Sequence, residues 1–529
     1  MRDARWSISR KKRILIVNCY FDDCRGAVRR PGKVPYAMGP VYLAGAFSPL
    51  CDVRLYNEVA SGPLEDPHLL GWPDMLVLTG LTNSFDRMLH LTAYGRTSNP
   101  RITVVAGGPA IRALPMLSRH FFDYACTGDI EELRDVIADA FGPSFAAEEM
   151  RPRFDLAYWI GSMGHVESSR ACNFRCSFCS LTGEGRAYRS YPLEDLRQQV
   201  IAMGRKKRLF FVDNNFYGAD RQSFSARVEL VKQLRQDGYF TEWGALVTND
   251  FFYMDQNLAR VRDAGCTLLF SGVESFDSAW LRGANKLQNL RYSPVALITK
   301  CLEAGIMFAY GLILDVMTRH IGDLRQELDF VVGTPEITLP GFLTLPIPLL
   351  ATPFFRECLD KRAFLPKTKL RDMDGSTLVL QPLGPVDEVA AFVRDILALR
   401  GYRWRALRHA TRFAQRYRST LSLAQLTLAM GSAGLLCADG LVTRRRSAAS
   451  GIPSRTHVTT TEVLDPMYTP AFRVGSHHER YFLPTMVTDA AGDLAPELAE
   501  VASPPATSRT PAALRGDPLP TPMQARRIS

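Results

Sequence analysis

The stretch Ser169-Arg170-Ala171-Cys172-Asn173-Phe174-Arg175-Cys176-Ser177-Phe178-Cys179 contains three cysteines in the spacing C-x3-C-x2-C. Thiolates are the usual ligands of iron–sulfur clusters, and a four-iron cluster normally takes four of them. A run that supplies three leaves one iron free to bind a substrate. A zinc knuckle would usually add a second Cys/His pair at short spacing, and no such pair follows Cys179. The stretch therefore predicts a [4Fe-4S] cluster held by Cys172, Cys176 and Cys179, with three unrelated buried cysteines as the structural alternative.

The length of the chain limits the number of domains, and its cysteine content indicates the cellular compartment. At 529 residues the chain exceeds the size of one core, which favours two or three domains. Eleven irregularly spaced cysteines are an odd number, and the charged start at residues 1–5 has no apolar leader segment. We expect a cytoplasmic protein whose thiols stay free to bind metal.

The net charge of +10 is concentrated near the C-terminal third of the chain. One predicted helix carries Arg394, Arg400, Arg403, Arg405, Arg408, Arg412, Arg416 and Arg418. A solvated helix face is one interpretation, and a surface for acidic lipid headgroups or an anionic substrate is the other. Residues 420–438 follow without a charge. Their polar content and the arginines at both ends favour a buried or peripheral helix over a membrane span.

Residues 1–150 alternate apolar runs with segments of helix length. The predicted strands are 13–18, 53–56, 74–80, 102–109 and 123–128. This alternation predicts a doubly wound parallel α/β sheet with a ligand crevice at the carboxyl ends of its strands. Gly107 and Gly108 follow the fourth strand and would let the backbone approach a ligand closely, although such a pair is more often a turn.

Residues 151–360 show a second series of strand–helix units. Apolar runs at 165–169, 209–212, 243–247, 268–273, 307–314 and 341–345 predict a partial (β/α)6 barrel. Polar residues follow these runs, and in such barrels the chemistry lies on the loops after the strands. The residues at these strand ends are Asp213, Asn214, Asn215, Thr248, Asn249, Glu274 and Ser275. The structural alternatives are a helix N-cap for Asp213 and a surface carboxylate for Glu274.

Both parts resemble the radical S-adenosylmethionine (SAM) enzymes of the cobalamin-binding subclass. The resemblance rests on the cysteine spacing and on short runs in both parts, namely 35–44, 105–109, 128–132, 211–216, 264–266, 272–275, 346–348 and 351–353. It implies that the open iron chelates the methionine part of SAM and that Phe178 packs near the adenine. It also implies that Asp213, Asn214 and Asn215 meet the methionyl end of SAM. Glu274 is implied to contact its nucleoside, and Gly107 and Gly108 to lie in a cobalamin-binding domain.

Two positions depart from the pattern of that family. Some cobalamin proteins carry a histidine that binds cobalt in the loop after the first strand. Here residues 19–26 contain none, and the first histidine is His68. The fifth barrel strand ends Gly311-Leu312-Ile313-Leu314-Asp315-Val316, where the family more often has a glycine-rich ending.

The remaining chain divides into two regions. We expect residues 361–445 to form a helical region that shapes the substrate pocket, and residues 446–529 to form an extended arm and a disordered tail. Six prolines between 504 and 522 predict disorder beyond about Glu497. Cys266, Cys301 and Cys358 are expected to be small buried residues.

The resemblance implies a radical SAM enzyme that functionalises an unactivated carbon, with cobalamin-dependent C-methylation as the outcome. Its cofactors would be a [4Fe-4S] cluster, SAM and cobalamin. The partners would be a small-molecule or lipid-like substrate and an electron donor such as flavodoxin or ferredoxin, without nucleic acid. A radical cyclisation, rearrangement or oxidation, SAM chemistry on a lipid at the membrane surface, and a non-catalytic iron–sulfur redox sensor stay open as alternatives.

Overall fold

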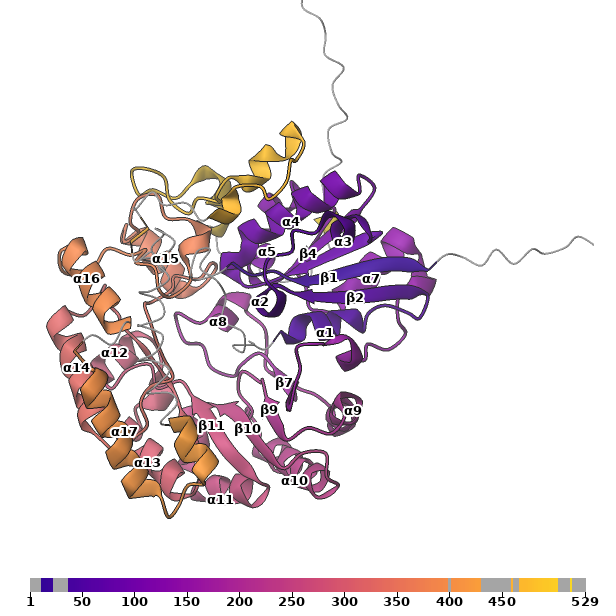
Figure 1. Cartoon of the computed structure of the whole chain (residues 1–529). Helices are drawn as coiled ribbons and strands as arrows, with labels where there is room; N and C mark the ends of the chain where they lie inside the picture. The colour runs from indigo at the N-terminus through magenta and orange to yellow at the C-terminus, as the bar shows by residue number, and fades with distance from the viewer. Residues whose placement is uncertain are drawn as a thin grey trace, which may run out of the picture.

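The computed structural model describes residues 11–21, 37–397, 401–429, 458–459, 466–502 and 514–515. Two sheets organise this part of the chain (Figure 1). The first belongs to the N-terminal region and the second to the predicted barrel. The carboxyl ends of the N-terminal strands point toward the barrel (Figure 1).

The N-terminal sheet has the strand order β15-β5-β4-β3-β1-β2. Its strands are β1 (Lys12–Asn18), β2 (Cys51–Asn57), β3 (Met75–Thr79), β4 (Thr103–Gly107), β5 (Tyr124–Cys126) and β15 (Leu514–Arg515). All neighbours pair in parallel except β15, which runs antiparallel to β5. The doubly wound parallel sheet predicted from the sequence is therefore confirmed, with one added edge strand.

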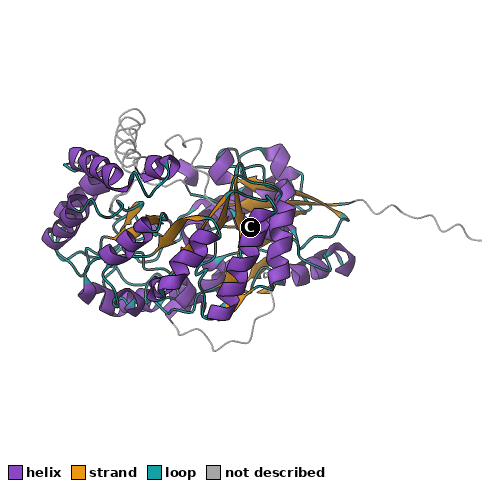
Figure 2. Ribbon diagram, turned by 90° about the horizontal axis from the view of Figure 1, so that it is seen from below, coloured by secondary structure: helices purple, strands orange, loops and turns teal. Residues whose placement is uncertain are grey.

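Strand β1 shows why helices cover both faces of this sheet. Ile14 and Ile16 belong to the apolar cluster that contains residues of α1 (Met38–Ala44) and α7 (Glu132–Phe141). Leu15 and Val17 belong to a second cluster with α4 (Phe85–Ser98) and α5 (Pro109–Ala113). Successive residues of a strand point to opposite faces. A run that is apolar at every position is therefore buried on both sides, with helices on both sides of the strands (Figure 2).

The second sheet has the order β12-β11-β10-β9-β6, and each described pairing in it is parallel. Its strands are β6 (Met163–Val166), β9 (Arg208–Phe211), β10 (Glu242–Val247), β11 (Cys266–Ser271) and β12 (Met307–Ala309). Helices α9 (Leu193–Met203), α10 (Arg221–Gln236), α11 (Asp255–Asp263), α13 (Pro294–Glu303) and α14 (Ile321–Gly333) alternate with the strands. Cys266 and Cys301 are buried in this core, as expected.

The strand predicted at 307–314 is interrupted, so that two short strands take its place in the barrel. It divides at Tyr310 into β12 and β13 (Gly311–Ile313), and β13 pairs with β14 (Phe342–Thr344). A parallel bridge between Glu274 and Leu312 connects β13 to the end of β11. The side chain of Tyr310 is buried and its hydroxyl donates to the carbonyl of Thr338 at 2.8 Å. The strands thus continue around the partial barrel with a break at Tyr310.

The C-terminal region contains α15 (Pro353–Asp360), α16 (Val386–Leu397) and α17 (Arg403–Tyr417). The chain is helical again over 423–429, and 430–438 of the predicted peripheral helix lie outside the described residues. Cys358 is buried in α15, as expected. No helix of the described residues is long and apolar enough to cross a membrane.

Residues 466–502 form an arm of short 3-10 helices against the N-terminal region. These are η7 (Pro466–Tyr468), η8 (Ser476–Phe482) and η9 (Pro496–Ala502). Leu498 and Val501 in η9 are buried. Disorder predicted from about Glu497 is wrong for this helix because both apolar side chains join the core on the α4 side of the N-terminal sheet. Residues 503–513 and 516–529 of the predicted tail lie outside the described residues.

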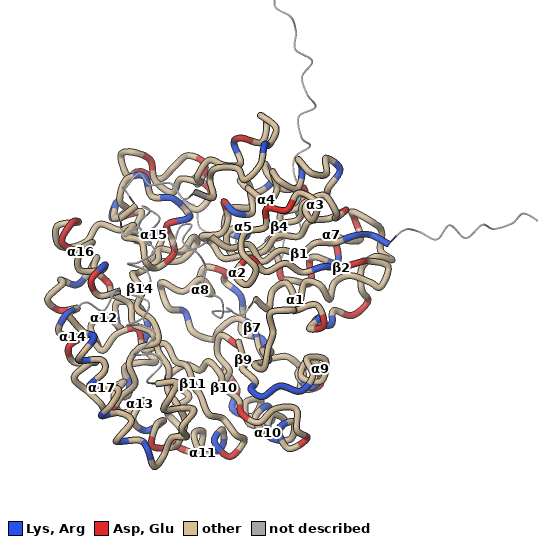
Figure 3. The backbone as a smooth tube through the Cα atoms, viewed as in Figure 1, with Lys and Arg blue, Asp and Glu red and all other residues tan. Residues whose placement is uncertain are grey.

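The basic helix α17 buries one face and exposes the other. Ala406, His409 and Phe413 are buried, and both ring nitrogens of His409 contact carbonyl oxygens at 3.1 and 2.9 Å. Arg408 and Arg412 are exposed on the other face. Basic residues recur along the outer edge of the molecule where α13, α14 and α17 lie (Figure 3). Helix α17 therefore exposes a basic face, as both interpretations of the sequence expected, but the prediction of one helix for all these arginines is wrong because Arg394 lies on the separate helix α16.

Candidate functional site

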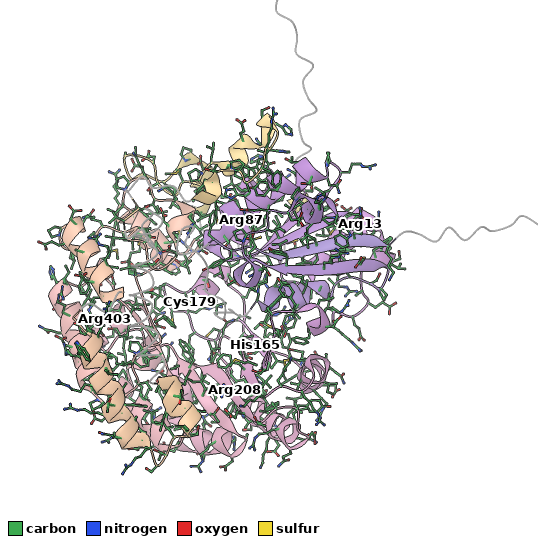
Figure 4. The ribbon with its side chains drawn as sticks, in the orientation of Figure 1. Arg13, Arg87, His165, Cys179, Arg208 and Arg403 are labelled. Carbon is green, nitrogen blue, oxygen red and sulfur yellow. The ribbon has the colours of Figure 1, made fainter. Side chains whose placement is uncertain are left out.

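The cysteine stretch forms a loop between β7 (Ser169–Arg170) and α8 (Ser180–Glu184). The loop closes because β7 pairs antiparallel with β8 (Arg189–Ser190), which lies beyond α8. Cys172, Cys176 and Cys179 are all free thiols. Cys179 lies in the central part of the molecule, between the N-terminal sheet and the barrel (Figure 4).

Burial controls the proton affinity of these thiols. Desolvation raises the pKa of Cys172 and raises the pKa of Cys179 to about 11, while the positive charge of Lys286 lowers both. Iron binds the thiolate, so cluster assembly would displace these protons. No group of three His, Cys, Asp or Glu among the described residues is placed to hold a metal ion. A set of three free thiols in one loop fits a cluster, in which separate irons take separate thiolates.

Asp213 follows β9 and directs its carboxylate to the start of the cysteine loop. The side chain is fully buried, and it accepts hydrogen bonds from the Ser168 amide at 3.1 Å, the Ser168 hydroxyl at 2.6 Å and the Ser169 hydroxyl at 2.5 Å. Burial raises the pKa of Asp213 and these donors lower it. The N-cap of the next helix is Asp220. Asp213 therefore holds the start of the cysteine loop in place, because it accepts hydrogen bonds from the backbone and hydroxyl groups of Ser168 and Ser169.

Asn214 and Asn215 have different environments, although they are adjacent. Asn214 is exposed, whereas Asn215 is fully buried. The Asn215 side-chain amide donates to Asn173 Oδ1, inside the cysteine loop, at 2.7 Å. Its own Oδ1 has no hydrogen-bond partner among the described residues. A buried acceptor without a partner is costly, so Asn215 is suited to a polar ligand beside the cysteine loop.

Two more buried asparagines near the ends of barrel strands β10 and β11, one of them in the loop before α13 (Pro294–Glu303), have an unpaired side-chain atom within the described part of the chain. Asn249 follows β10, accepts from the Ser271 hydroxyl at 2.6 Å and leaves Nδ2 unpaired. Asn289 donates to the carbonyls of Gly272 and Val273 at 2.8 and 3.0 Å and leaves Oδ1 unpaired. Unpaired donors and acceptors at this rim fit a ligand that is rich in polar groups, as SAM is.

Glu274 and Phe178 meet through Lys286. The Lys286 ammonium lies 2.5 Å from Glu274 Oε1 and 5.7 Å from the centre of the Phe178 ring. Only 15% of the Glu274 side chain is exposed, so it is not a surface carboxylate. Glu274 has a positive φ of 64° and its amide donates to the Gly311 carbonyl at 3.1 Å. Glu274, the predicted contact of the nucleoside, and Phe178, the predicted contact of the adenine, thus both contact the buried Lys286.

Gly107 and Gly108 lie at the end of β4, where three strand ends pack closely. Gly108 has a φ of 120°, and a Cβ there would lie 2.7 Å from the carbonyl oxygen of Gly80. A Cβ at Gly80 would in turn lie 2.8 Å from the carbonyl oxygen of Cys19. Packing of the chain against itself accounts for Gly108 and Gly80, whereas a Cβ at Gly107 would make only ordinary contacts, at 3.6 Å or more. The contact of Gly107 and Gly108 with a cofactor stays a prediction.

Arginines that flank the cysteine loop connect it to the N-terminal region. Arg186 contacts Asp129 at 2.5 Å, and Arg170 contacts Asp129 at 3.2 Å. Arg112 on α5 contacts Glu184 on α8 at 2.5 Å. Asp129 follows β5, so the carboxyl edge of the N-terminal sheet lies directly against the cysteine loop.

Sequence reasoning missed the segment that carries Lys286, Gln288 and Asn289. It lies between α12 (Ser278–Gly283) and α13 and reads Asn285-Lys286-Leu287-Gln288-Asn289. Polar residues in a loop normally indicate solvent exposure. The sequence offered no signal that would have distinguished these buried side chains from ordinary loop residues.

The profile of the radical SAM superfamily matches residues 166–322, which contain the cysteine loop and most of the barrel. The hopanoid C-2 methylase of Rhodopseudomonas palustris (strain TIE-1) is 24% identical over 381 residues, which cover 67% of this chain and 69% of that protein.

Two solved structures share the fold over both regions. The cobalamin-dependent SAM radical enzyme OxsB with aqua-cobalamin bound gives a TM-score of 0.54 at 14% identity, covering 84% of this chain and 82% of that chain. The radical SAM methyltransferase TsrM from Kitasatospora setae, with its tryptophan substrate and a SAM analogue bound, gives 0.51 at 14% identity. That match covers 83% of this chain and all of the TsrM chain.

Residues 166–322 therefore form a radical SAM domain, and the similarity to a methylase over 67% of the chain supports an enzyme. The cofactors of this class are a [4Fe-4S] cluster and SAM. This assignment favours the enzyme over the iron–sulfur sensor considered from the sequence.

Proposed function

We propose that the protein is a cobalamin-dependent radical SAM methylase acting on an unactivated carbon. The observation that carries the proposal is the placement of the N-terminal sheet, whose carboxyl edge contacts the cysteine loop through Asp129. In open α/β sheets ligands bind at this edge. The same two-domain arrangement occurs in OxsB and TsrM, and a methylase is a relative at the sequence level.

The side chains of this site divide the work of binding and orientation. When bound, the cluster and SAM supply the radical that removes a hydrogen atom, and cobalamin supplies the methyl group. Cys172, Cys176 and Cys179 would hold the cluster, and Asp213 holds their loop in place. Asn215 and Glu274 would orient SAM through an amide oxygen and a carboxylate.

Product analysis of anaerobically purified protein tests the proposal. The protein is reconstituted with iron and sulfide, supplied with SAM and a chemical reductant or a flavodoxin, and compared with and without cobalamin. We expect bound cobalt, 5′-deoxyadenosine and S-adenosylhomocysteine, the last being the form of SAM that has lost its methyl group. Well-folded protein that takes up no cobalt in excess cobalamin, yet forms 5′-deoxyadenosine, would replace methylation by another radical outcome such as a cyclisation or oxidation.

A lipid-like substrate at a membrane surface is the substrate class that one further feature favours. On α17, Trp404 is 81% exposed and Leu407 is also exposed, beside Arg408 and Arg412. Exposed aromatic and apolar side chains among arginines suit an anionic lipid interface. The relative from Rhodopseudomonas palustris is named for a hopanoid, which is a lipid.

Vesicle sedimentation separates this substrate class from a soluble one. Protein is mixed with vesicles containing phosphatidylglycerol or with neutral phosphatidylcholine vesicles. We expect binding to the anionic vesicles only, and weaker binding for the double variant Arg408→Gln/Arg412→Gln. Equal recovery of protein in the supernatant with both vesicle types would favour a soluble substrate.

A further inference from the structure

Three buried polar side chains lie in the short segment between α12 and α13. Lys286 is 7% exposed, Gln288 is 7% exposed and Asn289 is 2% exposed. The segment includes a single 3-10 turn, η5 (Leu287–Asn289). Lys286 pairs with Glu274, and Asn289 binds the carbonyls after β11. These contacts account for the burial of Lys286 and Asn289. The burial of the Gln288 side chain requires a separate explanation.

The side chain of Gln288 is directed at a cysteine of the candidate cluster site. Its amide nitrogen Nε2 lies 3.6 Å from Cys176 Sγ, within range of an N–H···S hydrogen bond. Cys176 is itself buried, with 8% exposure. The Tyr253 hydroxyl donates to the Gln288 carbonyl at 2.8 Å. This bond and the neighbouring contacts of Lys286 and Asn289 hold the backbone of Gln288, and from that backbone the side-chain amide reaches Cys176.

Hydrogen bonds to the sulfurs of an iron–sulfur cluster change its reduction potential. A donor stabilises the more negative, reduced cluster more than the oxidised one, and therefore raises the potential. Burial strengthens this effect because the local dielectric is low. Groups around the metal ligands tune a metal centre in this way without touching the metal.

We infer that Gln288 is a positioning residue that donates an N–H···S hydrogen bond to Cys176 and raises the reduction potential of the cluster. The inference rests on the proposed function only in that Cys176 ligates a cluster. It is independent of cobalamin and of the substrate. Gln288 would make the cluster easier for the electron donor to reduce, which is the step before SAM cleavage.

The potential of the cluster in Gln288→Leu tests the inference directly. Leucine replaces the amide by an apolar side chain of similar size and so removes the donor. Gln198→Leu is the matched control because Gln198 is exposed on α9 and bonds only Glu194 among the described residues. Both variants are reconstituted, and iron and sulfide per chain are measured before a redox titration followed by electron paramagnetic resonance.

We expect Gln288→Leu with a full cluster to show a lower midpoint potential. At a fixed solution potential its ratio of reduced to oxidised cluster should fall about tenfold, equivalent to about 59 mV for a one-electron couple. Gln198→Leu should match the wild type. A wild-type potential in Gln288→Leu would overturn the inference and leave the cluster assignment intact.

A measurement on the wild-type protein removes any dependence on the folding of the variant. Protein labelled with 15N at the glutamine side-chain amides is reduced and studied by pulsed electron–nuclear methods. A 15N coupling from one glutamine amide supports the hydrogen bond, and its absence in a fully loaded cluster contradicts it. Wild-type protein that assembles no cluster would contradict the proposed function, and with it this inference.

Discussion

At the scale of single residues, the buried carboxylates of the barrel rim are each paired with donors of the chain itself. Asp213 accepts from Ser168 and Ser169, and Glu274 is paired with Lys286. Burying a carboxylate is unfavourable unless such partners are present. These pairs therefore fix the geometry of the rim before a ligand binds. The two carboxylates have different expected roles, since Asp213 binds the start of the cysteine loop and Glu274 pairs with the lysine that lies over the Phe178 ring.

Substitution of Asp213 by Asn should weaken the attachment of the cysteine loop. An asparagine places an NH2 group among donors from Ser168 and Ser169, so at least one hydrogen bond is lost. We expect a loss of about 1–3 kcal/mol in the free energy of unfolding and less iron bound per chain after reconstitution. Denaturant unfolding and iron analysis measure both. Asp237→Asn, at an exposed position, is the control, and an Asp213→Asn protein with wild-type iron content would show that the loop does not depend on this carboxylate.

Substitution of Glu274 by Gln should keep the cluster and weaken SAM binding. The change preserves the shape of the side chain at its positive φ and removes the charge that pairs with Lys286. We expect SAM affinity to fall by about 1–3 kcal/mol, the scale of losing a charged hydrogen-bond partner. Equilibrium dialysis of the reconstituted protein measures this. Glu229→Gln on the exposed face of α10 should bind SAM normally, and an unchanged affinity in Glu274→Gln would remove Glu274 from the SAM site.

At the scale of elements, helix α4 is covered by the arm of residues 466–502. The Tyr468 hydroxyl donates to the buried Asp86, whose carboxylate also accepts from the Thr485 amide at 3.1 Å. His90 on α4 stacks on Phe482 with 4.6 Å between ring centres. The arm thus supplies partners for polar groups that would otherwise be exposed on the back of α4.

Burial of His90 predicts a pH dependence of stability. Desolvation, aided by the charge of Arg87, lowers the pKa of His90 well below that of an unfolded histidine, which is about 6.5. Below that pH the unfolded chain binds a proton that the folded chain does not, so stability falls as the pH falls. The contribution of His90 is at most about 1.4 kcal/mol per pH unit. Denaturant unfolding between pH 7 and pH 5 measures the slope.

The variant His90→Phe isolates this contribution. Phenylalanine preserves the stacking on Phe482 and does not titrate, so we expect a shallower dependence of stability on pH than in the wild type. His68→Phe, at an exposed position, should retain the wild-type slope. A wild-type slope in His90→Phe would mean that other groups cause the acid sensitivity.

At the scale of the whole molecule, the sequence predicted the features that repeat or that carry a fixed spacing. Apolar runs such as Arg13–Asn18 predict strands that are buried on both faces of a sheet. Three cysteines within eight residues predict a loop that binds an iron–sulfur cluster. The break at Tyr310 was not predictable, because the apolar run at 307–314 is continuous in sequence. The Tyr310 side chain is also held by a hydrogen bond to the carbonyl of Thr338, 28 positions away. Gln288 was missed for the same reason, since only the folded chain brings it to Cys176.

Cleavage of SAM by the reconstituted protein tests the central claim most directly. Wild-type protein with SAM and a low-potential reductant should form 5′-deoxyadenosine. Cys172→Ala, Cys176→Ala and Cys179→Ala should each lose both the iron–sulfur absorbance and this product, because a four-iron cluster cannot be held by two thiolates of the loop. Cys358→Ala, which removes a buried thiol outside the loop, should retain both. Full formation of 5′-deoxyadenosine by any one of the three loop variants would contradict the account.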